Sequence, residues 1–406
     1  MATNYFRTET SIGGLKLPNR ICIHPMEGAD SELDGSPGSL TYRRYRRFAE
    51  SGAALIWFEA VSVCSEGRSN ARQLYLTEEN AEEFRKLISE MHAISPDVKV
   101  ICQVTHSGRF NGNCPPALVS RNPYLDGKYP FHKNFPPVSD EYLDAVPEYY
   151  EKTVKLAKQV GFDGADIKTC HKYLLSELLG AHTREGKYGG SYENRTRLVR
   201  DIFARVKKYA DDKFVLATRM SVYDGIEYPY GFGVDEKDYH KPDYTEAVKL
   251  LNELGGMGLK LVNVTMGTPY YNPYLNKPHK SEILDGDEAA KLLMEGAARI
   301  KKECPDLTVV STGSTYLKGN AYEVGNGMLE RGEVDFVGFG RQAIAYPDFA
   351  KDLLAGKPID AKKSCIACNL CGDLLRAARP VCCVVRDRGA LSEARECFYD
   401  IKEKKA

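Results

Sequence analysis

The chain has 406 residues, and its 56 lysines and arginines balance 56 aspartates and glutamates. A net charge of zero argues against a nucleic-acid surface or a basic membrane patch, and no apolar run is long enough to span a bilayer. The N-terminal stretch MATNYFRTET lacks the apolar core of a signal peptide, so we expect a cytoplasmic protein.

Short apolar runs alternate along the chain with longer segments of helical period. In the segment NRTRLVRDIFARVKKYA, for example, Leu198, Ile202 and Val206 recur every four residues and mark one face of a helix. Eight evenly spaced units of this kind predict an α/β fold, a (β/α)8 TIM barrel, in preference to an open doubly wound sheet. The predicted strands cover residues 20–25, 54–60, 98–104, 162–168, 213–219, 259–265, 307–313 and 334–340.

Two longer intervals, 106–140 and 265–280, interrupt this rhythm, and both begin just after a predicted strand. Loops in this position lie on the barrel face where active sites are built, so we interpret both as substrate loops.

Chemically active residue types gather at the predicted C-terminal ends of the strands, which a barrel brings to one face. Glycine and arginine after the seventh and eighth strands also suit a phosphate site, because glycines let backbone N–H groups approach an anion. The match of GFGRQA to a dinucleotide fingerprint is rejected, since it belongs to the last strand and too little chain follows it. The residues concerned are Pro25, Met26, Glu27, Glu59, Ala60, Gln103, Lys168, His171, Tyr173, Arg219, Gly313, Gly340 and Arg341.

Five of the twelve cysteines fall within residues 365–383, and the first three have the spacing C-x2-C-x2-C. Cysteines in a cytoplasmic protein are mostly reduced, which argues against disulfides here. Thiolates gathered in this way hold either an iron–sulfur cluster or a structural zinc ion. We interpret the scattered Cys22, Cys64, Cys102 and Cys304 as small buried hydrophobes.

Several stretches resemble successive motifs of the old yellow enzyme family of FMN-dependent barrel oxidoreductases. They are LKLPNRICIHPMEGAD, CQVTHSGR, GFDGADIKTCHKYLLSELLGAHTREGKYGGSYENR, NVTMGTPYYNP and VGFGRQAIAYPDFAKDLLAGKP. The resemblance covers about residues 5 to 390. The cysteine motif is most similar to the branch that includes 2,4-dienoyl-CoA reductase and trimethylamine dehydrogenase. In that branch, this motif holds a [4Fe–4S] cluster. The FAD and NAD(P)H domains that follow in the dienoyl-CoA reductases are not expected here, since few residues follow Gly389.

The resemblance assigns cofactor roles residue by residue. Pro25, Met26 and Ala60 should line the flavin ring, and Gln103 should bond its pyrimidine edge. The Arg219 guanidinium should lie where negative charge gathers in reduced flavin. The phosphate-binding residues should be Gly313, Gly340 and Arg341.

The resemblance also implies the catalytic and metal-binding residues. His171 should orient the substrate and Tyr173 should donate a proton to it, unless Tyr173 is only a packing aromatic. Cys365, Cys368, Cys371 and Cys383 should be the cluster ligands, with Cys382 as an alternative fourth ligand and zinc as the alternative metal.

Two residues depart from the family pattern. Lys168 stands where many members have the first histidine of a substrate-anchoring pair, and it could serve an anionic substrate or merely pair with Glu27 or Asp166. Glu27 stands near the expected flavin N5, in place of a threonine or cysteine, and its role is left open.

Together these features predict an FMN- and [4Fe–4S]-dependent ene-reductase that acts on an activated C=C bond. We expect residues 1–360 to form the FMN-binding barrel and residues 361–406 to form a cluster-binding extension packed on it. Electrons should come from NAD(P)H or a separate electron-transfer protein, and a homo-oligomer is left open. Two alternatives stay open: an amine dehydrogenase or N-demethylase with Tyr270 and Tyr271 in an aromatic bowl, and a non-redox, zinc-stabilised, ligand-binding barrel.

Overall fold

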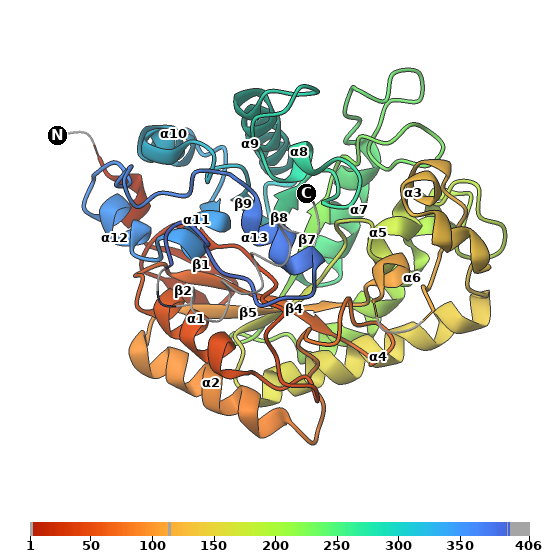
Figure 1. Ribbon diagram of the computed structural model, residues 1–406, viewed down its shortest axis with the longest axis horizontal. Helices are drawn as coiled ribbons and strands as arrows, with labels where there is room; N and C mark the ends of the chain where they lie inside the picture. The colour runs from red at the N-terminus through yellow and green to blue at the C-terminus, as the bar shows by residue number, and fades with distance from the viewer. Residues whose placement is uncertain (1–2, 113–114, 388, 390–406) are drawn as a thin grey trace.

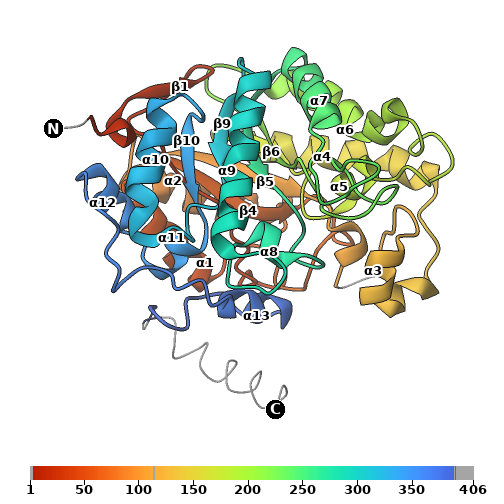
Figure 2. The ribbon, with the colours of Figure 1, turned by 90° about the horizontal axis from the view of Figure 1, so that it is seen from above.

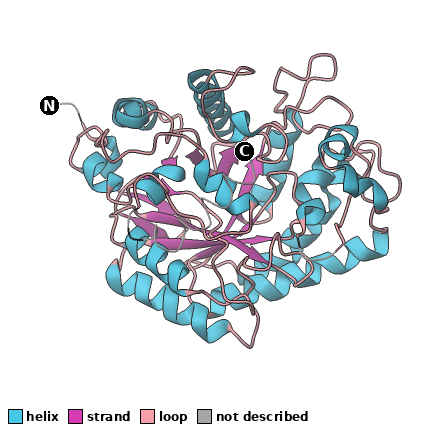
Figure 3. Cartoon of the chain, in the orientation of Figure 1, coloured by secondary structure: helices cyan, strands magenta, loops and turns pink. Residues whose placement is uncertain are grey.

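The computed structural model describes residues 3–112, 115–387 and 389. Parallel strands close into a barrel in the order β10-β3-β4-β5-β6-β7-β8-β9 at the centre of the molecule, and helices surround it (Figure 1; Figure 3). The predicted (β/α)8 barrel is therefore confirmed. The barrel strands are β3 Ile21–Ile23, β4 Leu55–Ser62, β5 Lys99–Thr105, β6 Gly164–Ile167, β7 Val215–Ser221, β8 Leu259–Thr265, β9 Thr308–Ser311 and β10 Phe336–Phe339.

The helices begin and end as follows: α1 Ser39–Ala49, α2 Ala81–Ile94, α3 Pro123–Lys128, α4 Asp140–Gln159, α5 Leu174–Leu179, α6 Tyr192–Val206, α7 Thr245–Gly256, α8 Pro273–Asn276, α9 Gly286–Glu303, α10 Ala321–Glu330, α11 Arg341–Ala345, α12 Phe349–Leu354 and α13 Leu370–Arg376. The helix expected from Leu198, Ile202 and Val206 is α6, and these three side chains are buried. The long interval 106–140 contains α3, and the interval 265–280 contains α8.

Alternation along each strand divides the core into two parts. On β7, Val215 and Ala217 point into the barrel, while Leu216 and Met220 pack outside it. Continuing this period of two places the Arg219 side chain inside the barrel at its C-terminal mouth. The same alternation on β5 carries Gln103 to the mouth above Ile101.

An irregularity in β4 decides which residue of that strand faces the mouth. Trp57 pairs with Ile101, but Ala60 pairs with Gln103, so β4 holds one residue more than β5 between these pairs. The extra residue reverses the alternation and brings Ala60 to the pocket. The Glu59 carboxylate instead accepts hydrogen bonds from Arg44 and from the backbone N–H of Gly28.

A hairpin of β1 (Thr10–Ile12) and β2 (Leu15–Leu17) packs against the interior of the barrel, and it was not among the predicted strands. Its buried side chains Ile12, Leu15 and Leu17 join the inward-facing residues of the barrel strands. Figure 2 shows β1 and α13 on opposite sides of the molecule. The hairpin therefore lies away from the end that carries the cysteine segment.

The predicted extension is described for residues 361–387 and 389. It forms hydrogen bonds and ion pairs with residues of the barrel domain. The Val381 N–H donates to the Gly28 carbonyl, and the Cys365 N–H donates to Gln342 Oε1. Asp387 accepts from Arg43 and Arg47 of α1. The predicted boundary at residue 360 stays a prediction, and residues 388 and 390–406 lie outside the described residues.

Candidate functional site

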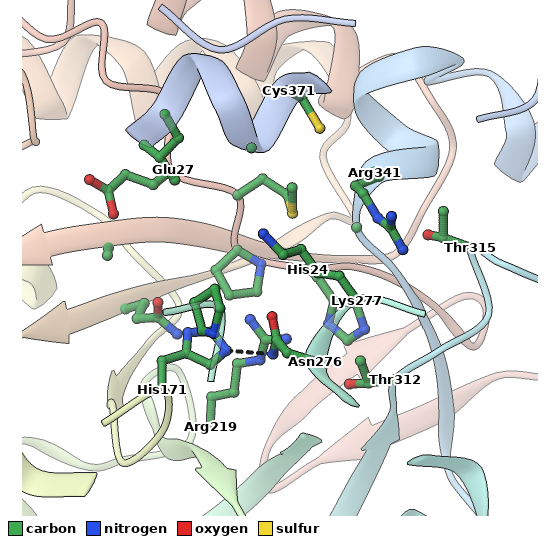
Figure 4. Close-up of a pocket in the computed structure, with 18 of the residues that line it drawn as sticks. His24, Glu27, His171, Arg219, Asn276, Lys277, Thr312, Thr315, Arg341 and Cys371 are labelled. Atoms are coloured by element: carbon green, nitrogen blue, oxygen red, sulfur yellow. Dashed lines mark hydrogen bonds between the residues drawn. The ribbon is translucent and has the colours of Figure 1, made fainter. Parts of the chain in front are cut away.

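A single pocket at the C-terminal mouth of the barrel collects the predicted residues (Figure 4). It encloses about 1000 Å³ of empty space, including the part that opens to solvent. Every residue assigned from the sequence to catalysis or to the flavin contributes to its wall, although the individual roles stay predictions. These residues are Pro25, Met26, Glu27, Ala60, Gln103, Lys168, His171, Tyr173, Arg219, Gly313, Gly340 and Arg341.

The buried carboxylate of Asp166 orients two of the pocket residues from below. It accepts hydrogen bonds from Gln103 Nε2 at 2.7 Å and from Trp57 Nε1 at 2.7 Å. It also accepts from the backbone N–H of Arg219 at 2.6 Å. Because the amide nitrogen of Gln103 is engaged, its side-chain oxygen is the atom free to accept a bond from a ligand.

Arg219 brings a buried positive charge to the pocket floor. Its Nε has no hydrogen-bond partner among the described residues. Burial lowers the pKa of the guanidinium, and the nearby Cys170 and Asp166 oppose this shift. A buried cationic group with an unused donor is costly unless a ligand accepts from it, so this position suits an electron-rich group.

Lys168 rises from the end of β6 and places its Nζ 3.8 Å from the centroid of the Tyr173 ring. Burial lowers the pKa of the amine, Cys170 and Glu27 oppose the shift, and Arg219 adds to it. Among the described residues, Lys168 forms no ion pair with Glu27 or Asp166, so the pairing considered from the sequence is not observed.

The carboxylate of Glu27 is held by the loop after β4. Ser69 Oγ and Asn70 Nδ2 both donate to its Oε1, the latter at 2.8 Å. Burial raises its pKa, while these two donors and Lys168 oppose the shift. The raised pKa makes the neutral form of this carboxyl easier to populate than in an exposed glutamate.

His171 and Tyr173 stand on a tight turn after β6. His171 and Lys172 have φ angles of 69° and 57°, in the left-handed region. The Asn276 amide lies 2.9 Å from His171 Nε2, and the Tyr173 hydroxyl lies 2.9 Å from the Tyr270 hydroxyl. Burial lowers the pKa of His171 well below its usual value, so the ring is neutral at pH 7. Figure 4 shows His171, Asn276 and Arg219 side by side in the pocket.

The predicted phosphate side combines glycines with Arg341. Gly313 has a φ of 108°, and a Cβ added to Gly338 would lie 2.3 Å from the His24 ring, so no side chain fits there. Arg341 donates to Asn369 Oδ1 and to the Pro278 carbonyl, the latter at 2.9 Å. Arg341 thus joins the end of β10 to the cysteine segment as well as to the pocket.

The four predicted cluster cysteines line one small cavity of about 330 Å³, together with Arg341. Cys382 lines a different cavity, next to Arg43 and Asp387. Cys371 contributes to the walls of both the cysteine cavity and the main pocket, and Figure 4 shows it near Arg341. The geometry therefore favours Cys383 over Cys382 as the fourth member of the set.

In this structure, the described thiols of the segment do not form a group of three within the span of one ion. Within the described ranges, only Cys64, Glu66 and His106 place three ligand atoms within 4.8 Å of one another. Four thiolates on one zinc ion would put neighbouring sulfur atoms about 3.8 Å apart. Burial raises the pKa of Cys371, and Arg341 and Lys277 oppose the shift by favouring the thiolate.

Several pocket residues were not recognised from the sequence. His24, Asn276, Lys277 and Thr315 all line the pocket. Burial lowers the pKa of Lys277 to about 8. The signal available for Asn276 and Lys277 was their place in the interval 265–280, which was interpreted as a substrate loop with roles considered only for Tyr270 and Tyr271.

Residues 10–359 match the model of the family described as "NADH:flavin oxidoreductase / NADH oxidase family". The chain belongs to this family of FMN-dependent oxidoreductases, as the resemblance to the old yellow enzymes predicted.

Two curated relatives illustrate the match. An NADH oxidase of Thermoanaerobacter brockii is 26% identical over 89% of this chain and 52% of its own length. An NADPH dehydrogenase of Bacillus cytotoxicus is 27% identical over 86% of this chain and 92% of its own length. The chain therefore spans about half the length of the first relative and nearly all of the second.

A solved structure with a similar fold is a 2-naphthoyl-CoA reductase in complex with 2-naphthoyl-CoA. It has a TM-score of 0.76 and 18% identity, and the match covers 98% of this chain and 58% of that chain. None of the described helices is long and apolar enough to cross a membrane.

The pocket fits FMN on its own chemistry. Arg219 Nε and His24 Nε2 are buried without partners in the described structure. Gly313 has a backbone conformation that favours glycine, and Gln103 offers an acceptor. A polar, electron-rich ring and an anionic tail would satisfy these groups.

Proposed function

We propose that the protein is an FMN-dependent ene-reductase that reduces an activated C=C bond and holds a [4Fe–4S] cluster in its cysteine segment. The observation that carries the proposal is the convergence of Tyr173, His171, Lys168 and Arg219 on one pocket. These four residues supply a proton donor, a neutral hydrogen-bonding ring and two cations in a space of ligand size.

When bound, FMN would supply hydride to the β-carbon of the substrate. Pro25, Met26 and Ala60 would contact its ring, and Gln103 would accept from its pyrimidine edge. Gly313, Gly340 and Arg341 would hold the phosphate. Arg219 would stabilise negative charge on the ring side.

The reaction needs a carbonyl or similar group held beside a proton donor. His171 is a neutral ring that Asn276 orients, so it can hold the activating group without adding charge. Tyr173 would give the proton to the α-carbon. Lys168 and Lys277 add positive charge to the pocket wall, which supports a substrate that carries a carboxylate or another anionic group.

In the cysteine segment, the ligands we propose are Cys365, Cys368, Cys371 and Cys383. Their arrangement around one cavity, with no three sulfur atoms as close as a single ion requires, supports a multi-iron cluster over zinc. The cluster would carry single electrons, and the position of Cys371 between the two cavities supports transfer across that wall. The external electron donor we propose is NAD(P)H, in line with the names of the curated relatives.

An oxidative amine reaction is the weaker candidate. Phe110, Tyr129, Tyr173 and Tyr270 gather beside the pocket, and aromatic faces attract cationic amines. Lys168, Lys277 and Arg219 would repel the same amines from the same space. The balance of charge therefore favours an anionic or neutral acceptor.

The test is anaerobic purification followed by titration of the reduced enzyme. We expect acid to release noncovalent FMN, and metal analysis to find about four iron atoms per chain. Enoates or enones should reoxidise the reduced flavin, and methylamines should not reduce the oxidised flavin. Protein that contains zinc and no flavin, or that reacts only with amines, would contradict the proposal.

A further inference from the structure

Tyr270 is hydrogen-bonded to Tyr173, the predicted proton donor. Its hydroxyl oxygen lies 2.9 Å from that of Tyr173, although the two residues are 97 positions apart in the sequence. Both side chains line the pocket, Tyr173 on the turn after β6 and Tyr270 on the loop after β8.

The Tyr270 ring is rigidly placed. It stacks on Phe110 with centroids 3.7 Å apart and an angle of 10° between the planes. Its backbone carbonyl accepts a hydrogen bond from the Tyr129 hydroxyl at 3.1 Å. The hydroxyl of Tyr270 is therefore directed to Tyr173 by contacts that do not depend on the hydroxyl itself.

Proton donation by Tyr173 would leave a phenolate in a buried site. Burial raises the pKa of Tyr173 well above its usual value, and Tyr270, Glu27 and Cys170 add to this shift in the resting site, where both phenols keep their protons. In the opposite sense, the ammonium of Lys168 lies over the ring at 3.8 Å. Once Tyr173 has lost its proton, Tyr270 is the member of the phenol pair that still has a hydrogen to donate.

We propose that Tyr270 and Lys168 are positioning residues for Tyr173: the Tyr270 hydroxyl donates to the Tyr173 oxygen as it becomes a phenolate, and the Lys168 charge stabilises the ring. The inference rests on the proposed function. In the step, the O–H bond of Tyr173 breaks and a C–H bond forms at the α-carbon, while the β-carbon receives hydride from reduced flavin. Tyr173 then recovers a proton from water.

A nitroalkene substrate separates the two halves of this step. Hydride addition to a nitroalkene produces a nitronate anion, which is stable enough in water to be seen by its ultraviolet absorbance before it is protonated. Flavin reoxidation therefore reports hydride transfer, and nitronate decay on the enzyme reports proton transfer.

The decisive variant is Tyr270→Phe in the FMN-loaded full chain. The change keeps the ring that stacks on Phe110 and removes only the hydroxyl. We expect flavin reoxidation at the wild-type rate and nitronate protonation slower by about 10- to 100-fold, the range for losing a hydrogen bond to a charged group. Lys168→Met should slow the same step, and the double variant should be slower than either single variant.

Tyr124→Phe is the matched control, because it removes a phenol hydroxyl of α3 that donates to Glu227 and not to Tyr173. It should change neither rate. Wild-type nitronate decay in Tyr270→Phe would overturn the inference and leave the proposed function standing. A wild-type enzyme that no alkene reoxidises would overturn the proposed function and this inference with it.

Discussion

The charged residues of the pocket and those buried behind it differ in their partners. Lys168 and Lys172 are four residues apart, and their side chains are almost completely buried, with 4% and 0% of each residue exposed. Lys172 forms an ion pair with Asp224 at 2.5 Å, whereas Lys168 lies over the Tyr173 ring without a carboxylate partner among the described residues.

The same difference separates two buried arginines. Arg109 pairs with both Asp126 and Glu177, and it also donates to the Ser120 carbonyl. Within the described ranges Arg219 has no such carboxylate pair, although the Nε atoms of both arginines lack a hydrogen-bond partner. A buried charge is costly unless it is paired, so the paired residues support the fold and the unpaired ones are poised for a ligand.

The strongest test of this comparison sets a pocket phenol against a scaffold phenol. Tyr173→Phe should slow turnover of an activated alkene by a factor of about 10² to 10⁴, because it removes a positioned proton donor. Flavin binding and flavin reduction should stay near normal. Stopped-flow measurement of both half-reactions checks this.

Tyr150→Phe is the scaffold counterpart. The Tyr150 hydroxyl accepts a hydrogen bond from the backbone N–H of His106, away from the pocket. This variant should keep the wild-type turnover and lose about 1 kcal/mol of stability. If Tyr173→Phe reduces the alkene at the wild-type rate, the proton comes from water or from His171 and not from Tyr173.

The ion pair behind the pocket should affect stability instead of chemistry. Lys172→Met leaves the Asp224 carboxylate buried without its cation, which should lower the free energy of unfolding by about 3–5 kcal/mol. Urea denaturation measures the loss. The double variant Lys172→Met/Asp224→Leu should recover much of it, and a double variant as unstable as the single one would argue that packing of the lysine stem matters more than its charge.

Much of the barrel could be predicted from the sequence because its signals are local. Each predicted strand overlaps an observed one, since every strand is a short apolar run between helical segments. The β1–β2 hairpin was missed because three-residue strands carry little periodic signal. The irregularity that turns Glu59 away from the mouth also depends on pairing with β5, which no single segment reveals.

The site was predictable where it followed strand ends, and less so where it depended on loops. Gln103 and Arg219 follow from alternation along their strands. The partners of the catalytic residues, Asn276 for His171 and Tyr270 for Tyr173, come from a loop 97 or more positions away. Contacts of this kind are set by tertiary packing, so the sequence marked the loop without assigning its bonds.

His106 is a third kind of buried group, because its ring is hydrogen-bonded only to neutral partners. Its titration extends the comparison to the pH dependence of stability. His106 Nδ1 accepts from the Gly108 N–H, and Nε2 lies 2.9 Å from the Tyr142 hydroxyl. Burial lowers its pKa from 6.5 to about 4. The unfolded chain therefore binds a proton below pH 6.5 that the folded chain does not bind until about pH 4.

Stability should accordingly fall as the pH is lowered from about 6.5 to about 4, by about 3 kcal/mol from this residue at most. Denaturation at a series of pH values measures the slope. His106→Gln should reduce the slope in that window, whereas an unchanged slope would assign the acid sensitivity to other groups.

Lys168→Met gives the smallest and most selective effect. The lysine has no carboxylate partner to strand among the described residues, so its loss should leave stability unchanged or slightly higher, in contrast to Lys172→Met. Because Lys168 is proposed to act on Tyr173, the variant should turn over both a neutral ester and its matched acid more slowly. If the charge also binds the substrate, kcat/KM for the acid should fall further, by a factor that corresponds to about 1.5–3 kcal/mol of transition-state stabilisation. This is the range for a hydrogen bond to a charged group. Matched acid and ester pairs measure this difference directly.

Equal losses of kcat/KM for the acid and the ester would limit Lys168 to its action on Tyr173. A loss of stability as large as that of Lys172→Met would remove the distinction between the paired and unpaired lysines.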